Sequence, residues 1–106
     1  MFNITKTPTF TVPVPIVLEG IDEPMSLRAT FRAISDDEAI GADQKSLDGF
    51  KDFLRRVTVR LHDLEDDEGP VEFTPALFDE LISHSHIRMA LQRAFWSAML
   101  KARVGN

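Results

Sequence analysis

The chain has 106 residues, of which 43% are hydrophobic and 27% are charged, and it contains no cysteine. This mixture is typical of a globular domain and excludes the low-hydrophobicity composition of disordered chains. Twelve Lys and Arg residues against 17 Asp and Glu give a net charge of -5. That charge opposes binding to nucleic acid or to anionic membranes. The lack of cysteine excludes disulfides and thiolate metal sites, which suits a reducing cytoplasm.

The first predicted elements are two strands. Large apolar residues alternate with Thr and Pro over residues 10–18, and the alternation resumes over residues 25–33. This period of two predicts a β-hairpin at about residues 9–34 with one buried face. Pro13 and Pro15 would both lack an N–H group on the same side of the first strand, so this strand is predicted to lie at the edge of a sheet.

Two helices are predicted next. The period changes at Ser35, where the sequence Ser-Asp-Asp-Glu forms a capping box that predicts the start of a short helix. Over residues 47–61 the apolar residues gather on one side of a helical wheel, which predicts a longer amphipathic helix. An acidic segment at residues 63–70 is expected to end this helix and to form a solvated turn.

The last two predicted elements are also helices. Thr74 followed by Pro75 predicts an N-cap and the first position of a two-turn helix. Ser85 is predicted to cap a final helix at about His86–Arg103. The expected fold is therefore α+β, with an N-terminal β-hairpin (about 9–34) packed against three to four α-helices (about 35–103) in a single domain of residues 1–106.

The final predicted helix carries two apolar faces. The broader face consists of Ile87, Leu91, Ala94, Phe95, Ala98 and Ala102. On nearly the opposite side, Met89, Trp96 and Leu100 form a second stripe beside Arg93. Large apolar side chains are rarely left in water unless a partner covers them, so Met89, Arg93, Trp96 and Leu100 are predicted to bind a partner. The alternative is that this stripe lies under the hairpin or under another helix.

Candidate metal ligands are few. The acidic run from Asp63 resembles the start of a calcium loop, but the sixth and twelfth positions are Glu68 and Thr74 instead of glycine and glutamate. His84 and His86 have no third ligand of obvious geometry nearby in the sequence. We therefore expect neither a metal nor any other cofactor.

Motifs for catalysis and for membrane insertion are also missing from the sequence. It contains no Gly-rich phosphate loop, no Gly-x-Ser-x-Gly elbow, no His-Glu-x-x-His pair and no tyrosine. We therefore expect a protein that is not an enzyme. No apolar run reaches membrane-spanning length, and residues 1–6 lack the apolar block of a secretion signal, so a soluble intracellular protein is expected.

Two short runs resemble a known family. Pro70-Val71-Glu72-Phe73-Thr74 follows the acidic turn, and Ala90-Leu91-Gln92-Arg93-Ala94-Phe95 lies in the last helix. In this order of parts the chain resembles the tail assembly chaperones of long-tailed bacteriophages. In that family a Pro-rich, hairpin-forming N-terminal region precedes a helical half with an acidic loop, a Pro-Val-x-Phe-(Ser/Thr) step and an Ala-Leu-x-x-Ala-aromatic run. The likeness covers most of the chain.

The resemblance implies a non-catalytic protein that binds the tape-measure protein and helps to recruit tail-tube subunits, with possible self-association along its client. It implies a location in the cytoplasm of the bacterial host and absence from the mature virion, with no nucleic acid or membrane as partner. Many members are made in a short form and a frameshift-extended form, and an end at residues 104–106 is compatible with the short form. The alternative function is a small cytosolic adaptor or ligand-binding module, and an enzyme ranks third.

Overall fold

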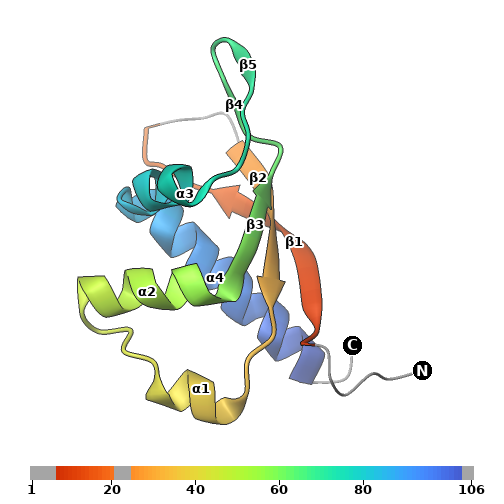
Figure 1. Cartoon of the computed structure of the whole chain (residues 1–106), viewed down its shortest axis with the longest axis vertical. Helices are drawn as coiled ribbons and strands as arrows, with labels where there is room; N and C mark the ends of the chain where they lie inside the picture. The colour runs from red at the N-terminus through yellow and green to blue at the C-terminus, as the bar shows by residue number, and fades with distance from the viewer. Residues whose placement is uncertain (1–6, 21–24, 104–106) are drawn as a thin grey trace.

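The α+β fold expected from the sequence is confirmed by a computed structural model (Figure 1), which describes residues 7–20 and 25–103, without the side chains of residues 102 and 103. Predictions for residues 1–6, 21–24 and 104–106 and for the side chain of Ala102 lie outside this part. The elements are, in chain order, β1 (Thr9–Ile16), β2 (Met25–Arg32), α1 (Asp36–Gly41), α2 (Leu47–Val57), β3 (Thr58–His62), β4 (Glu65–Asp66), β5 (Gly69–Pro70), α3 (Pro75–Ile82) and α4 (Ser85–Arg103).

The predicted hairpin forms two strands of a three-stranded antiparallel sheet. Its strand order is β1-β2-β3, and β1 pairs with β2 from Thr9 opposite Arg32 to Ile16 opposite Met25. β1 therefore lies at an edge, as the two prolines predict, and it ends at Ile16 instead of reaching residue 18. The side chains of alternate residues on β1 and β2 point into the core, so the period of two identified the buried face correctly.

The third strand was not expected from the sequence. The helix predicted over residues 47–61 ends at Val57, and the chain continues directly into β3. Leu61 follows Val57 at a spacing of four, so it fits the apolar face of a helix, but it also fits the inward face of a strand. In the structure Leu61 is buried opposite Ala29 of β2. The β-branched pair that begins at Thr58 favours the strand, and the pairing with β2 satisfies its backbone.

The acidic turn takes the form of a small hairpin whose residues 65–68 are exposed. β4 and β5 pair through Glu65 opposite Pro70, and Figure 1 shows this hairpin projecting from one end of the molecule. Its root is held by Asp63, whose carboxylate accepts hydrogen bonds from the Arg28 guanidinium at 2.8 and 3.3 Å. Asp63 has a φ of 63°, a left-handed conformation that Asp tolerates better than most residues.

The predicted caps of α1 and α3 are confirmed. The Ser35 hydroxyl accepts a hydrogen bond from the Glu38 N–H at 3.1 Å, and the Thr74 hydroxyl accepts one from the Leu77 N–H at 3.1 Å. Pro75 occupies the first turn of α3, where a missing N–H leaves no unpaired donor. These side chains satisfy backbone groups that the first turn of a helix cannot pair internally.

The start of α4 differs from its prediction. Ser85 is the first residue of the helix and not its cap, because the Arg88 N–H donates to the carbonyl of His84 at 3.0 Å. The Arg88 side chain also donates to the carbonyl of Ile82 at 2.8 Å. The connection between α3 and α4 is therefore short, and Arg88 binds the last turn of one helix to the first turn of the next.

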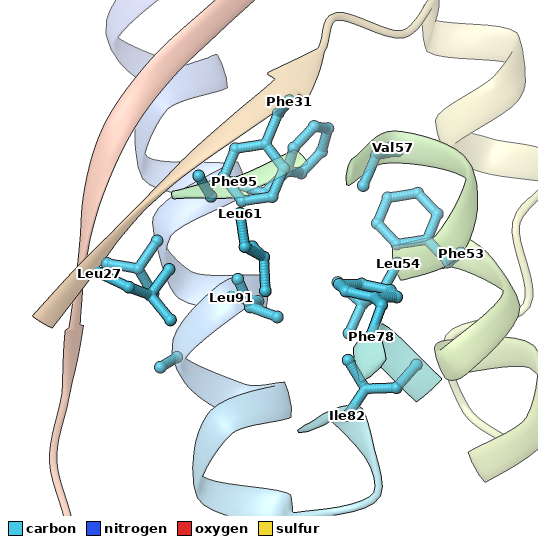
Figure 2. Packing of buried hydrophobic residues seen from close by; sticks show 13 residues of the cluster. Leu27, Phe31, Phe53, Leu54, Val57, Leu61, Phe78, Ile82, Leu91 and Phe95 are labelled. Atoms are coloured by element: carbon cyan, nitrogen blue, oxygen red, sulfur yellow. The ribbon is translucent and has the colours of Figure 1, made fainter. Parts of the chain in front are cut away.

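Phe95 lies at the centre of the core and joins the sheet to the helices (Figure 2). Its ring meets Phe31 of β2 at 5.4 Å and Phe53 of α2 at 5.6 Å between centroids, edge-on in both pairs. Phe10 of β1 stacks on it at 6.1 Å. Such aromatic pairs add to the free energy gained by burial alone. The other fully buried residues are Val14, Ala29, Leu54, Val57, Leu61, Ile82, Ala90 and Leu91.

Replacing Phe95 with Ala is expected to lower the free energy of unfolding by about 3–5 kcal/mol, because it removes a buried ring that contacts three elements. Urea denaturation followed by circular dichroism measures this change. Leu100→Ala is the matched control on the same helix, since Leu100 is 60% exposed, and it is expected to change the free energy by less than about 0.5 kcal/mol. Equal losses in the two variants would contradict the central role of Phe95.

Candidate protein-binding surface

A groove runs between the edge strand β1 and helix α4, which lie side by side in Figure 1. Its volume is about 620 Å³. We call it the β1–α4 groove, and its lining consists of Phe10, Val12, Pro13, Pro15, Val17, Ala90, Arg93, Ala94, Ser97, Ala98 and Lys101. Most of these side chains are apolar, so the groove can bury apolar groups of another molecule.

The floor of the β1–α4 groove is made of small residues. Ala90, Ala94 and Ala98 recur every four residues on one side of α4, and none of them extends beyond its Cβ atom. Arg93 and Lys101 are the ionisable residues of the lining, and both are exposed. Neither forms an ion pair with any residue that the structure describes. The groove therefore combines an apolar floor with two positive charges that no described carboxylate pairs with.

A smaller hollow lies on the other side of α4, against α1. Its volume is about 310 Å³, and we call it the α1–α4 hollow. It is lined by Ile34, Ser35, Asp36, Ala39, Ile40, Trp96, Met99 and Leu100. Ile40 is 83% exposed at its rim. Apolar surface is thus available on both sides of the same helix.

The four predicted partner-binding residues follow one stripe of α4, at spacings of four, three and four residues, but they do not all border the same pocket. Met89 is 42% exposed and Leu100 is 60% exposed, and Arg93 is also exposed. Arg93 borders the β1–α4 groove, whereas Trp96 and Leu100 border the α1–α4 hollow. The alternative that this stripe lies under another element does not apply to Met89 or Leu100. Partner binding by these residues stays a prediction.

Trp96 differs from the other three because it is half-buried. Its ring stacks on Phe53 of α2, with centroids 5.8 Å apart and an angle of 6° between the planes. Its indole N–H points to the side-chain oxygen of Gln44 at a donor–acceptor distance of 3.3 Å. Trp96 therefore joins α4 to α2 and leaves only part of its surface for the hollow.

Arg32 fixes α1, which forms one wall of the α1–α4 hollow. Its guanidinium donates to the Glu38 carboxylate at 2.6 and 3.3 Å and to the backbone carbonyl of Arg56 at 2.6 Å. One side chain at the end of β2 thus binds both α1 and the last turn of α2. The hydrogen bonds from Arg32 lower the pKa of the Glu38 carboxyl, and partial burial opposes this effect more weakly.

The residues considered for metal binding remain on the surface. The rings of His84 and His86 lie 5.9 Å apart, and Glu65 to Glu68 are exposed on the acidic hairpin. Within residues 7–20 and 25–103, no three His, Asp or Glu side chains converge as a metal ion would require. Over the same described ranges, no helix combines the length and the apolar character needed to cross a bilayer.

Chemically, the surface around α4 can bury apolar groups and pair with carboxylates. The helical wheel identified Met89, Arg93 and Leu100 as exposed residues of α4 but also included the half-buried Trp96, and it missed the β1–α4 groove, because a wheel does not show which elements lie beside the helix. The available signal was the repeat of alanines every four residues together with the proline-rich edge strand. Comparisons with known protein families, with curated proteins and with solved structures found no match.

Replacing Glu38 with Gln is expected to reduce the dependence of stability on acid pH. Because the folded-state pKa lies below the ordinary value of 4.5, ionised Glu38 stabilises the fold above about pH 4.5. This contribution is lost as the pH falls through the lower folded-state pKa. The melting temperature, measured from about pH 6 to about pH 3, should therefore fall less steeply in Glu38→Gln than in the wild type.

The matched control for this experiment is Glu72→Gln, which removes an exposed carboxylate outside the α1 region. Identical slopes in the wild type and in Glu38→Gln would mean that the Arg32–Glu38 pair adds nothing to the pH dependence of stability.

Proposed function

We propose that this chain is a non-catalytic tail assembly chaperone of a phage or prophage, which binds the tape-measure protein and helps to recruit tail-tube subunits. It would act in the cytoplasm of the bacterial host and be absent from the mature virion. The observation that supports this proposal best is the surface of α4, which offers apolar area to a partner on both sides. The order of sequence motifs described above supports the choice of the phage family.

The shape of the surface suits a helical client. A tape-measure protein contains long apolar helical stretches, and helices commonly bind by laying one apolar face into a groove. Complete burial of a large apolar side chain is worth about 1.5–3 kcal/mol, so covering Met89 and Leu100 would favour association. A chaperone of this kind needs no reaction centre, only enough apolar surface to keep the client from aggregating.

The β1–α4 groove and the α1–α4 hollow provide separate sites for two partners. The β1–α4 groove and the α1–α4 hollow lie on different sides of α4. A client helix in the groove would leave the hollow available for a tail-tube subunit or for a neighbouring copy of this chain. Self-association along the client is therefore compatible with the proposed function.

The alternative is a small adaptor or ligand-binding module. The volume of about 620 Å³ favours it, because ligand pockets commonly occupy about 300–1,000 Å³. The exposed apolar surface of α4, however, extends beyond the groove to Met89 and Leu100. Protein partners would together cover that whole surface, whereas a small ligand would fill only the groove, so we favour protein partners.

Co-expression with a tape-measure protein tests the proposed function. The chain is expected to increase the soluble fraction of that client, measured by sedimentation and gel densitometry. The double variant Met89→Ser/Leu100→Ser should lower the soluble fraction, because it removes exposed apolar side chains without altering the core.

Val59→Ser is the matched control, since Val59 is an exposed apolar residue on β3, away from α4. This variant should protect the client as well as the wild type does. A client that stays equally insoluble with and without the wild-type chain would contradict the chaperone function. Saturable binding of a metabolite, without any effect on the client, would favour the ligand-binding alternative.

A further inference from the structure

We propose that the β1–α4 groove binds a partner α-helix laid alongside α4, with two carboxylates of that helix facing Arg93 and Lys101. This inference rests on the proposed function and deepens it, since it specifies the form and the charge of the client segment. Three features of the groove support it: the unpaired edge of β1, the small residues of α4 and the charges of the lining.

The edge of β1 is poorly suited to pairing with an added strand. Among the strands that the structure describes, β1 pairs only with β2, and Pro13 and Pro15 cannot donate hydrogen bonds from its other edge. Two carbonyl groups of an added strand would therefore find no N–H donor on β1 over this stretch. A helix satisfies its own backbone groups internally and requires only side-chain contacts. The prolines thus favour a helical occupant over an extended one.

The floor of the groove allows a helix to approach closely. Ala94 and Ala98 are partly exposed and Ala90 is buried next to them, so this row along α4, at a spacing of four residues, presents only methyl groups. Side-chain ridges of one helix pack into such rows of another, and the distance between helix axes is shortest where the contacting residues are small. Phe10 and Val12 of β1 form the opposite apolar wall. An apolar ridge of a partner helix would be buried between these two sides.

The positive charges of Arg93 and Lys101 indicate that the partner helix carries carboxylates beside its apolar ridge. Arg28, Arg32 and Arg55 each bind a carboxylate at 2.6–2.8 Å, whereas Arg93 and Lys101 bind none within the described part of the chain. Two free cations on a protein with a net charge of -5 make the groove locally basic. Arg93 and Lys101 are eight residues apart, which is about 12 Å along the helix. Carboxylates seven or eight residues apart on a roughly parallel or antiparallel partner helix would match them.

A second copy of this chain is a weaker candidate for the groove. Its acidic hairpin could supply the carboxylates of Glu65 to Glu68, but the same residues offer no apolar side chain to fill the floor. The groove needs both properties in one segment, so a helix with an apolar face and spaced acidic residues fits better. Occupation by a second copy is one outcome that the experiment distinguishes.

Calorimetric titration of the full chain with two designed peptides tests this proposal. Both peptides are capped helices of about 18 residues, or about five turns, with one Leu and Ala face. One carries two glutamates seven positions apart beside that face, and the other carries glutamines there. The wild type should bind the glutamate peptide about threefold to tenfold more tightly, and this preference should shrink as salt is added.

The variant Arg93→Gln/Lys101→Gln should bind both peptides with the affinity that the wild type shows for the glutamine peptide. Its matched control is Lys45→Gln/Arg60→Gln, which removes two exposed cations outside the groove and should preserve the preference for glutamate. Ala94→Leu should weaken binding of both peptides, because a larger side chain occupies the floor. Circular dichroism confirms that each variant is folded.

Several outcomes would overturn the proposal. One is undiminished preference for the glutamate peptide in Arg93→Gln/Lys101→Gln, and another is binding of neither peptide by the wild type. A wild-type dimer that this variant dissociates would assign the groove to a second copy instead.

The groove and the chaperone function can fail separately. If the wild type protects a tape-measure client but binds neither peptide, the function stands and the groove proposal fails. If the peptides bind as expected but the client stays insoluble, the groove proposal stands and the function fails.

Discussion

The contacts of Phe95 determine how α4 is placed, and the rest of the structure depends on that placement. One ring meets Phe10 and Phe31 from the sheet and Phe53 from α2, so the helix cannot rotate about its axis without breaking at least one aromatic pair. Because the rotation is fixed, the alanines of α4 must face β1 and Trp96 must face α2. The position of the groove is therefore a consequence of core packing.

The two sides of α4 differ in the size of their side chains. The side with large residues stabilises the fold, and the side with small residues leaves space for a partner. Towards α2, Trp96 adds a large stacked ring to the core. Towards β1, Ala90, Ala94 and Ala98 contribute little volume, so the same helix leaves space beside the edge strand. A helix that was large on both sides would bury more of its own surface and offer less to a partner. The small residues bury less apolar area within the chain, which lowers its free energy of unfolding, but they leave a surface on which another molecule can pack.

Local patterns predicted much of the fold, and tertiary contacts account for what they missed. The alternation of β1 and β2 and the Ser35 and Thr74 caps depend on neighbours in the sequence, so they were recognisable. β3 was not, because Leu61 satisfies both a helical and a strand period and only its pairing with Ala29 decides between them.

The candidate site was less predictable than the fold for the same reason. A helical wheel placed Trp96 with Met89 and Leu100, but it could not show that Phe53, far away in the sequence, covers one of the three. It also could not show that β1 lies beside the alanines of α4. The sequence shows which residues share one side of a helix, whereas their exposure and the groove both depend on a second element.

The stacking of Trp96 on Phe53 also gives the molecule a natural optical reporter. The chain has one tryptophan and no tyrosine, so its near-ultraviolet emission comes from a single indole at the junction of α2 and α4. That indole lines the α1–α4 hollow but not the β1–α4 groove. A molecule that entered the hollow would change the surroundings of the chromophore directly. One that entered the groove would leave it in place, so the spectrum of the unlabelled protein distinguishes the two sides of one helix.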